Sequence, residues 1–532
     1  MSNIKKMTNW RWMIVGLLFI ATTVNYLDRQ VLSLTWKDFI APEFHWNDDN
    51  YGTITAWFSI FYAIACLLAG KFIDWAGTKK GYLIAIFVWS TGACLHAASG
   101  IFTMAARGYS STAAMAAETD ASAILLITSL SVYAFLACRF ILALGEAGNF
   151  PAAIKVTAEY FPKKDRAFAT SIFNAGASVG ALVAPASIPL LARYFKDAGI
   201  GGGWEMAFII IGALGYVWML FWILCYAKPE KSKHVNEAEL AYIQQDDKEE
   251  VKASQEKEEK VISFWRCFTF KQTWAFVAGK FFTDGVWWFF LFWAPAYFSS
   301  QYRYTSDSKE AIILIFTLYA IVTILSIFGG YLPRIFVEKK GMEPYSGRML
   351  AMLIFAFFPL LALVAQPLGT YSAWWPAIII GLVGAGHQAW SANLFSTIGD
   401  MFPKSTIASI TGIGAMAGGV GSFIINKGSG KLFTHAAGSF TYDGKEYELS
   451  ADVIEKTFNL GDKALGSIDA QGMIAKVTEL GGEIVTQPMV ALGFEGKPAG
   501  YMIIFCVCAV AYLVGWSIMK ALVPKHKAVK VD

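Results

Sequence analysis

Twelve stretches of about 20 or more mostly apolar residues, separated by polar breaks, follow one another along the 532-residue chain. A helix needs about 20 such residues to cross the hydrocarbon core of a bilayer. The pattern therefore predicts an all-α polytopic membrane protein with twelve transmembrane helices. The predicted spans cover residues 10–36, 52–73, 81–100, 124–154, 167–192, 204–226, 272–299, 310–332, 348–367, 373–398, 406–426 and 500–523.

The composition agrees with a lipid environment. Hydrophobic residues make up 56% of the chain and charged residues 16%, which excludes an ordinary soluble domain of this length. The 44 Lys and Arg residues and 40 Asp and Glu residues leave a net charge of +4, too small to indicate a nucleic-acid partner. The seven cysteines show no metal-ligand or disulfide spacing. We expect a protein of the lipid bilayer with no cofactor, no metal and no nucleic acid.

Basic residues mark alternate junctions between the predicted spans. Lys and Arg precede the first span, follow the second, fourth and eighth, enrich the segment after the sixth, and close the chain. Cytoplasmic loops of membrane proteins carry such an excess of positive charge. The distribution predicts that both termini are cytoplasmic, and we expect a multi-pass protein of the plasma membrane, the inner membrane of a bacterium.

Two long polar segments predict the domain organisation. The densely charged segment 227–271 is predicted to be a cytoplasmic linker between an N-terminal bundle, residues 1–226, and a C-terminal bundle, residues 272–532. A second segment, 428–498, is predicted to be an extracytoplasmic insert. Its TYDGKEYELS run has the glycine-punctuated pattern of a hairpin. We expect a small cap, and decoration of the fold is the favoured interpretation of it.

An internal repeat indicates two related halves. Residues 70–80, after the second span, are similar to residues 330–340, after the eighth, at an offset of 260. Residues 160–163 and 401–404 match at an offset of 241. Two six-helix pseudo-repeats of this kind place a substrate near the midplane of the membrane, between the halves.

Several of these segments resemble one known family. Gly70–Lys80 resembles the signature loop of the major facilitator superfamily in spacing, chemistry and position, although Arg334 and Val337 replace its acidic residue and a glycine in the second copy. Other segments resemble the anion:cation symporter family, and two are most similar to hexuronate transporters. The first group comprises Asn25–Arg29, Arg139, Gly145–Ala147, Phe150–Pro151, Glu159–Pro162 and Arg166, and the second Phe173–Gly176 and Gly386–Ala389.

The resemblance implies a fold and a function. It implies the major facilitator fold and a secondary active transporter that imports an acidic sugar by proton symport with alternating access. The sugar is a hexuronate such as galacturonate or glucuronate, or an aldonate. The partners are then a small organic anion and protons, and we expect a monomer. Exchange of sugar phosphates or other organic anions is the alternative, and a membrane sensor is a third. No nucleotide loop or nucleophile motif indicates an enzyme.

Four ionisable residues fall inside predicted spans: Asp28 and Arg29 in the first, and Arg139 and Glu146 in the fourth. Each costs about 2.5–3.5 kcal/mol at the centre of a membrane helix, so we expect them to face a polar interior and to partner one another. A guanidinium can hold a carboxylate through two hydrogen bonds, so Arg29 and Arg139 are candidates for binding the substrate carboxylate. A static ion-pair network is the alternative, disfavoured because buried pairs stabilise poorly.

Glu146 and Asp28 are the candidates for proton coupling. Burial favours a protonated carboxyl group, whereas a nearby arginine favours the ionised form. An anion that competes for the arginines can therefore change the protonation of the acids. In the family that the chain resembles, the fourth-span acid couples protons and the first-span acid tunes it, and Glu146 and Asp28 hold those positions. Which acid titrates first stays open.

Polar and aromatic residues inside the spans are candidates for binding the sugar. Adding the repeat offset of 241 to Glu146 gives His387, interpreted as a binding group rather than a proton carrier. The spacing of Lys280 and Asp284 predicts a charge pair, near two tryptophans that could stack on a sugar ring. Packing against lipid or other helices explains these tryptophans equally well. The substrate-binding candidates are Tyr26, Tyr62, Asn174, Trp287, His387, Gln388, Ser391 and Asn393.

The loop after the second span is predicted to act in gating and topology rather than in binding. Gly70 permits close approach of another helix, and Asp74 can meet a helix N-terminus or a loop arginine. The two lysines at its end are expected to anchor it at the anionic membrane surface. The residues assigned to this gating loop are Gly70, Asp74, Gly77, Lys79 and Lys80.

Overall fold

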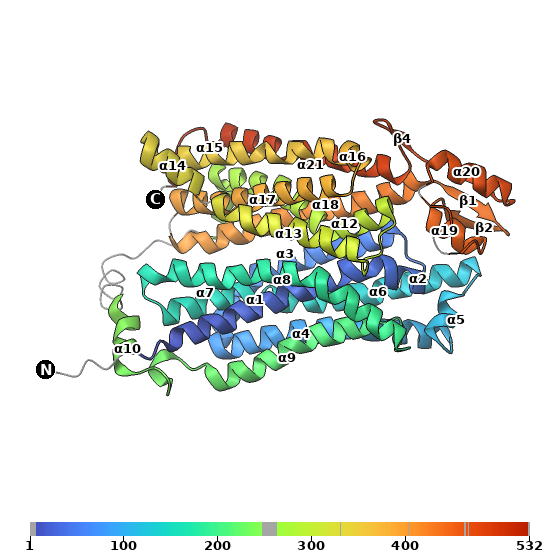
Figure 1. Cartoon of the computed structure of the whole chain (residues 1–532). Coiled ribbons are helices and arrows are strands. Elements are labelled where there is room, and N and C mark those ends of the chain that lie inside the picture. The colour runs from blue at the N-terminus through green and yellow to red at the C-terminus, as the bar shows by residue number, and fades with distance from the viewer. Residues whose placement is uncertain are drawn as a thin grey trace.

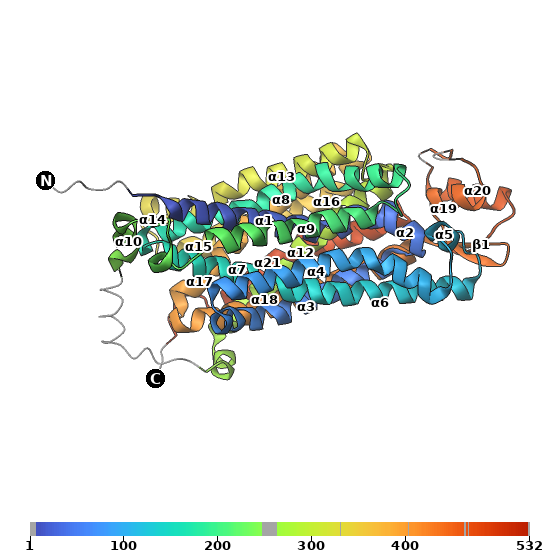
Figure 2. The same cartoon turned by 90° about the horizontal axis from the view of Figure 1, so that it is seen from below.

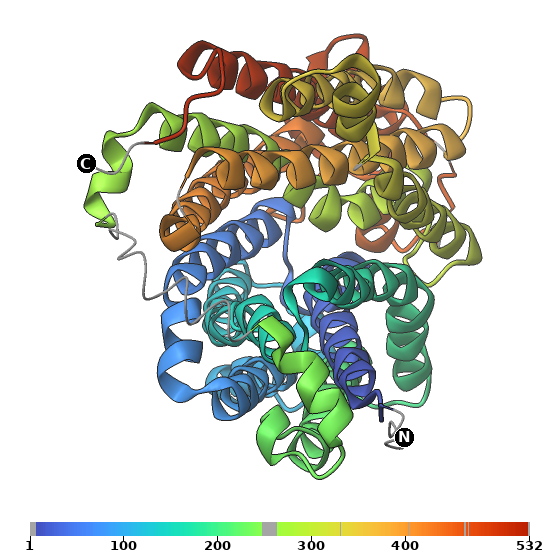
Figure 3. The same ribbon diagram turned by 90° about the vertical axis from the view of Figure 1, so that its left-hand side faces the viewer.

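The computed structural model describes residues 7–246, 263–329, 331–402, 404–461, 464–466 and 468–529. Long helices run side by side, and those that precede the linker form one group beside those that follow it (Figures 1 and 3). A small unit of strands and short helices projects from one end of the helices, and linker residues 237–246 lie at the opposite end (Figure 2). We call these the insert end and the linker end.

The N-terminal helices supply six candidate membrane spans among the described residues. The first span consists of α1, a π-helical turn at Trp36–Ile40 and α2, and the fourth consists of α6 and α7. The helices are α1 (Trp10–Thr35), α2 (Ala41–Phe44), α3 (Asp48–Ala76), α4 (Thr78–Arg107), α5 (Thr112–Ala116), α6 (Ala121–Glu146), α7 (Asn149–Tyr160), α8 (Lys163–Asp197) and α9 (Trp204–Cys225).

The C-terminal helices supply five more candidate spans within the same described ranges. A sixth helix, α17, is 28 residues long but carries several polar residues in its middle and falls short of the apolar content of the others. The predicted fold class is therefore confirmed. The helices are α12 (Lys271–Tyr302), α13 (Lys309–Gly329), α14 (Tyr331–Lys340), α15 (Pro344–Ala356), α16 (Ala362–Gly369) with a 3-10 turn before it (Phe358–Leu361), α17 (Trp374–Met401), α18 (Lys404–Ala437) and α21 (Lys497–Leu522).

Local sequence signals begin and end the helices around the site. Asn47 caps α3 through a reciprocal capping box, in which each of Asn47 and Asn50 accepts a hydrogen bond from the other's backbone N–H, at 3.0 and 2.9 Å. The side chain of Asp120 accepts a hydrogen bond from the backbone of Ala123 and starts α6. Gly77 separates α3 from α4 with φ of 77°, a left-handed value that favours glycine.

The first part of the linker packs against the start of α1. It contains a 3-10 turn at Pro229–Lys231, α10 (Glu237–Ile243) and a second turn at Gln244–Asp246, and a further turn, Trp265–Thr269, precedes α12. The buried carboxylate of Glu239 accepts hydrogen bonds from the backbone N–H groups of Trp10 and Arg11, at 3.0 and 3.1 Å. An anion there satisfies the free amides of the helix N-terminus and fixes α1. Linker residues 247–262 lie outside the described residues.

The insert folds around its own small core. Its elements are β1 (Ser439–Tyr442), β2 (Lys445–Glu448), α19 (Ala451–Thr457), α20 (Ala470–Glu479), β3 (Glu483–Thr486), β4 (Val490–Ala491) and β5 (Phe494–Glu495). The strand order of its three-stranded sheet is β2-β1-β3. The predicted hairpin is confirmed, with Asp443 and Gly444 both at positive φ in the turn.

The predicted start of the insert at residue 428 is wrong, because α18 continues to Ala437. The ring of Phe433 is buried and lies 4.1 Å from that of Tyr501 on α21, measured between centroids. This apolar contact keeps the polar stretch after residue 428 helical. The insert therefore begins at Gly438, and Lys497 begins the last helix.

Candidate functional site

The predicted intramembrane charges lie on α1 and α6, and one pair of them is joined. Asp28, Arg29, Arg139 and Glu146 are each no more than 5% exposed. The guanidinium of Arg29 donates two hydrogen bonds, from Nε and Nη2, to Oε2 of Glu146, at 3.1 and 2.8 Å. The expected partnership is therefore present for this pair, which links α1 to the end of α6.

Glycine at position 145 sets the place of Glu146. A Cβ atom on Gly145 would lie 2.3 Å from the backbone nitrogen of Trp89 on α4, so no larger residue fits between the two helices. The close packing of α6 on α4 fixes the last turn of α6 at the depth of Arg29. This turn ends at Glu146, where the chain passes into α7.

Aromatic rings enclose the rest of the Arg29 guanidinium. The centroids of the Tyr26, Tyr62 and Trp288 rings lie 5.2, 4.6 and 5.1 Å from its central carbon. A cation stacked on aromatic faces is stabilised by the ring electrons, most strongly where water is excluded. Trp288 comes from α12, so the cage around Arg29 is built from both groups of helices.

Asp28 and Arg139 depart from the prediction that all four charges partner one another. The Asp28 carboxylate forms no salt bridge within the described residues and interacts with the side chain of Trp89 on α4, and Nη1 of Arg139 is buried without a hydrogen bond. The Phe58 ring lies over the Arg139 guanidinium, with its centroid 5.2 Å from the central carbon. A buried charge without a partner is costly, and a site that keeps one is a candidate for binding an opposite charge.

A narrow cavity joins the two arginines. Both line it, and so do residues of α3 and α12. In this conformation it is too small to hold a water molecule, so a ligand needs the helices to part. Sequence reasoning missed four polar or aromatic residues of α1 and α3 in its wall, although their helical spacing from Arg29 and Tyr62 could have identified them. These residues are Ser33, Tyr51, Thr55 and Phe58.

The predicted binding residues of α17 differ in their surroundings. Nδ1 of His387 lies 2.6 Å from the hydroxyl of Tyr512 on α21, and the Trp287 ring stacks parallel to the imidazole at 5.2 Å. Asn393 is buried and donates to the carbonyl of Ala389 in its own helix, at 2.8 Å. His387, Trp287 and Asn393 are therefore already occupied by protein contacts.

Three further predicted residues are less engaged. Gln388 and Ser391 are half-buried, and Asn174 on α8 is exposed. None of the three makes a side-chain hydrogen bond with another residue in the described part of the chain. Gln388 and Ser391 thus keep free polar groups beside His387, whereas nothing in the structure links Asn174 to the buried charges.

The gating-loop prediction needs two corrections, the first of which concerns glycine. A Cβ atom on Gly70 would meet no atom within 4 Å, so this residue does not serve close helix approach. Gly77 instead supplies the turn between α3 and α4. Oδ1 of Asp74 accepts from Nζ of Lys155 on α7, at 2.7 Å, and among the side chains that the structure describes no arginine pairs with it.

The second correction concerns the lysines of the same loop. The ammonium group of Lys79 is engaged by protein rather than free, because it donates to the carbonyls of Ile223 and Tyr226, at 3.0 and 2.6 Å. These carbonyls close the C-terminal end of α9, where a cation is favourable. Lys80 is exposed, as an anchoring role requires.

Contacts between the two groups of helices close the insert end. A Cβ atom on Gly52 would lie 2.9 Å from the Cα of Gly430, so only glycines allow α3 and α18 to touch there. Deeper in the same seam the hydroxyls of Ser59 and Ser422 lie 2.8 Å apart. These two contacts hold α3 against α18 from the insert end to the depth of the arginines, where the neighbouring Phe58 ring lies over Arg139.

Ion pairs join the helices to the insert at the insert end. Asp48 on α3 accepts from Lys497 on α21 at 2.6 Å, and Lys497 also contacts Glu448 of the insert at 2.7 Å. Arg303, which follows α12, binds Glu455 of the insert. Burial opposes the charge of Arg303, but hydrogen bonds with Glu455 and Asp452 outweigh it and raise its pKa.

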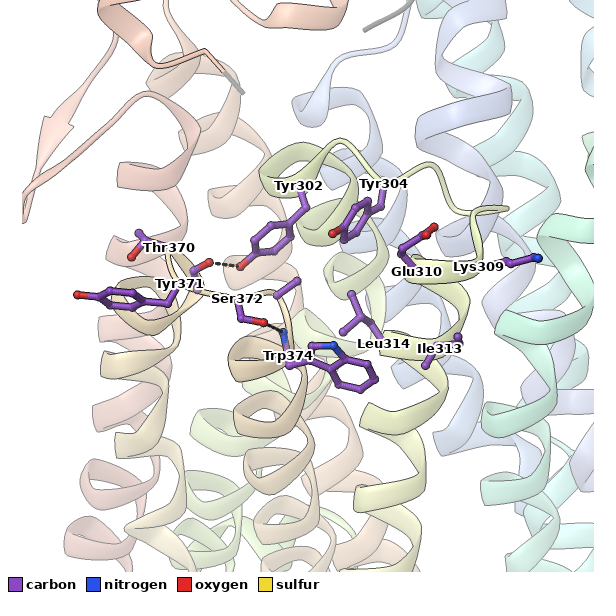
Figure 4. Close-up of a pocket in the computed structure, with 12 residues that line it drawn as sticks. Tyr302, Tyr304, Lys309, Glu310, Ile313, Leu314, Thr370, Tyr371, Ser372 and Trp374 are labelled. Atoms are coloured by element: carbon purple, nitrogen blue, oxygen red, sulfur yellow. Dashed lines mark hydrogen bonds between the residues drawn. The ribbon is translucent and has the colours of Figure 1, made fainter. Parts of the chain in front are cut away.

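A wider pocket lies at the insert end of the C-terminal helices, away from the buried charges (Figure 4). Tyr302, Tyr304 and Trp374 line it, with the hydroxyl of Tyr302 bonded to the carbonyl of Gly369 at 3.0 Å. Tyrosine and tryptophan gather where membrane helices meet the polar boundary of the bilayer. This pocket belongs to such a boundary, and we do not assign it to binding.

A comparison with known families matches residues 18–425 to the sequence model of the Major Facilitator Superfamily. Three relatives share similar identity. The hexuronate transporter of Escherichia coli K12 is 26% identical over 78% of this chain and 85% of its own. The galacturonate transporter of Dickeya chrysanthemi is 26% identical over 66% and 89%. The probable galactarate/D-glucarate transporter of Bacillus subtilis is 28% identical over 79% and 88%.

Solved structures show the same fold. A bacterial homolog of the human lysosomal transporter Spinster, in an inward-facing and occupied conformation, superposes with a TM-score of 0.60. It is 17% identical, over 98% of this chain and 99% of its own. A D-xylose–proton symporter gives a TM-score of 0.57 at 15% identity, over 97% and 98%.

The two arginines are predicted to differ in their effect on stability. Replacing Arg29 by Met leaves Glu146 buried without its partner and should lower the free energy of unfolding by about 3–5 kcal/mol. Arg139→Met removes a charge that has no partner and should raise it by roughly 1–3 kcal/mol. Chemical unfolding in detergent measures both. Equal destabilisation by both changes would make Arg139 a structural member of one ion-pair network.

Proposed function

The chain belongs to the major facilitator superfamily, and from that premise we propose that it imports an acidic sugar by proton symport. It is a multi-pass membrane transporter and not an enzyme. The proposed substrate is a hexuronate such as galacturonate or glucuronate, or an aldonate. Relatives named hexuronate and galacturonate transporters support this class of substrate. The observation that carries the proposal is the Arg29–Glu146 pair, with Arg139 unpaired beside the same cavity.

Competition for Arg29 supplies the coupling in this proposal. The substrate carboxylate binds Arg139 and takes the place of Glu146 on Arg29, whose two hydrogen bonds are then made to the substrate. Glu146, released into a buried site, takes up a proton because a free carboxylate there is too costly. Loss of this proton on the other side of the membrane lets Glu146 reclaim Arg29 and expel the substrate. Asp28, buried without a salt bridge among the described residues, is the second acid of the same site.

Alternating access moves the two groups of helices about this site. We place the insert outside the cell and the termini in the cytoplasm, because the basic loop lysine Lys79 contacts the C-terminal end of α9, next to the lysine-rich linker, at the end opposite the insert. A bacterial inner membrane is the proposed location. The closed seam of α3 and α18 then faces outside. Opening it requires the contacts along this seam to break.

The remaining candidates would contact the sugar. Tyr26 and Tyr62 present hydroxyls at the Arg29 cage, and Gln388 and Ser391 keep free polar groups on α17. His387, Trp287 and Asn393 are proposed to shape the wall, since their polar groups or faces are engaged. Asn174 stays a candidate for a conformation in which α8 moves. A small organic anion and protons are the proposed partners, and a monomer suffices for the site.

A panel of substrates in proteoliposomes tests the function. With an imposed pH gradient, the wild-type protein should accumulate galacturonate or glucuronate, or gluconate or galactonate, and should not accumulate glucose. Glucose competing better than every acid would overturn the proposal. Exchange of organic anions, the alternative on the same fold, would appear as counterflow that ignores the pH gradient.

Glu146→Gln is the sharpest variant in the same vesicles. A glutamine cannot release a proton, so accumulation driven by the gradient should fall to background while exchange across the membrane persists. Glu43→Gln is the matched control, because Glu43 is also a buried glutamate of the N-terminal helices but bonds to Trp204 instead of an arginine. Unaltered accumulation by Glu146→Gln would remove Glu146 from proton coupling.

A reversible cross-link tests alternating access. Cysteines in place of Ser59 and Ser422 should form a disulfide under mild oxidation, since the two hydroxyls are 2.8 Å apart. The joined α3 and α18 cannot part, so uptake should fall at least tenfold and return on reduction. Each single cysteine variant under the same oxidant controls for the seven native cysteines. Full uptake by the cross-linked protein would show that this seam need not open.

A further inference from the structure

A second charge pair lies inside the membrane, on α12 of the C-terminal helices. Nζ of Lys280 is 2.6 Å from Oδ2 of Asp284, one helical turn away, and the two side chains are 9% and 13% exposed. Charged side chains within transmembrane helices are expensive and mark functional positions more often than structural ones. The mechanism proposed above uses neither residue.

The pair points along the same face of α12 as the arginine cage. Lys280, Asp284 and Trp288 follow one another at intervals of four residues, so they form one row on the helix. Trp288 ends the row against Arg29, at 5.1 Å, and against the Tyr62 ring, at 5.8 Å between centroids. The row therefore leads from the proposed carboxylate site of the N-terminal helices into the C-terminal helices.

The pair keeps free hydrogen-bonding capacity. An ammonium group has three donors and a carboxylate has two acceptor oxygens. Beyond their mutual contact, neither side chain makes a hydrogen bond with another residue of the described ranges, and the Phe395 ring lies over the Lys280 ammonium group, at 4.7 Å. Lys280 is buried and Asp284 half-buried in this closed conformation, so a ligand reaches these free groups when the helices part.

Helix α18 packs closely against the carboxylate of the pair. A Cβ atom on Gly418 of α18 would lie 2.3 Å from Oδ2 of Asp284, so glycine is required where α18 passes the carboxylate. On the α17 side, His387 and Tyr512 are already bonded to each other. Lys280 and Asp284 are thus the charged groups of this region with unused donors and acceptors, in addition to the free polar groups of Gln388 and Ser391 on α17.

We propose that Lys280 and Asp284 bind neighbouring hydroxyl groups of the substrate, with Lys280 donating to one hydroxyl oxygen and Asp284 accepting from the next. This inference rests on the proposed function and assigns the groups that recognise the hydroxyls of an acid with one carboxylate. The pair carries no net charge, so a second carboxylate would have to displace Asp284. Uronates and aldonates should therefore bind better than aldarates, which carry two carboxylates.

Binding to the solubilised full chain, measured by calorimetry, tests this role. Lys280→Met and Asp284→Asn should each weaken galacturonate binding roughly tenfold to a hundredfold, the loss of one hydrogen bond to a charged group. The wild type should bind galacturonate at least tenfold more tightly than glucarate. Glucarate binding that is tighter, and that Lys280→Met selectively abolishes, would make Lys280 a second carboxylate contact and overturn the proposal.

Reversing the pair separates binding from stability. Lys280→Asp combined with Asp284→Lys restores an ion pair at the same spacing. A binding role predicts that the melting temperature recovers while galacturonate affinity stays at least tenfold reduced. Recovery of both would show a purely structural pair. The control is reversal of the exposed pair Arg334 and Glu338 on α14, which are 2.6 Å apart at the same spacing. This reversal should change neither the melting temperature nor the galacturonate affinity.

The wild-type result distinguishes the two levels of the account. If the unaltered chain binds no acidic sugar, the proposed function fails. If it binds galacturonate and the altered pair binds it equally well, only the role of Lys280 and Asp284 fails. The comparison of galacturonate with glucarate on the wild type needs no variant, so it stands even where a variant does not fold.

Discussion

The buried ion pair between Arg29 and Glu146 is the constraint around which the molecule is organised. It places two charges inside a membrane protein, where an unpaired ion costs several kcal/mol after relaxation. The fold tolerates this free-energy cost because Arg29 donates two hydrogen bonds to Glu146, at 3.1 and 2.8 Å, and aromatic rings cover the guanidinium. The last turn of α6 is held in place by Gly145 against α4, and α1 by Glu239 at its N-terminus. Packing far from the pair thus fixes its geometry.

Arg139 gives an incoming anion a binding group beside the Arg29–Glu146 pair. Arg139 shares the cavity with Arg29 and forms no salt bridge within the described residues, so one of the two buried arginines of the site is left for another anion. An anion that enters there gains Arg139 and competes with Glu146 for Arg29. Trp288 of α12 touches the same guanidinium, so a change at the pair is felt directly by the C-terminal helices. These direct contacts are sufficient for the proposed coupling between the proton, the substrate and the movement of the helices.

Sequence patterning was sufficient for the architecture and for the residue types of the site. The apolar periodicity predicted every span, including α17, whose polar middle makes it the least apolar of them. It could not say which of four buried charges would pair, because that depends on side-chain geometry across two helices. The extension of α18 past residue 428 and the contact of Lys79 with α9 were missed for the same reason. Both depend on neighbours that are distant in sequence.

The direct test of the central claim is proton uptake on substrate binding, measured with the solubilised full chain in weak buffer near neutral pH. If the substrate carboxylate displaces Glu146 from Arg29, addition of galacturonate should make the solution more alkaline, approaching roughly one proton taken up per substrate bound. Calorimetry in parallel gives the amount bound. Tight binding of galacturonate with no proton taken up would contradict the account.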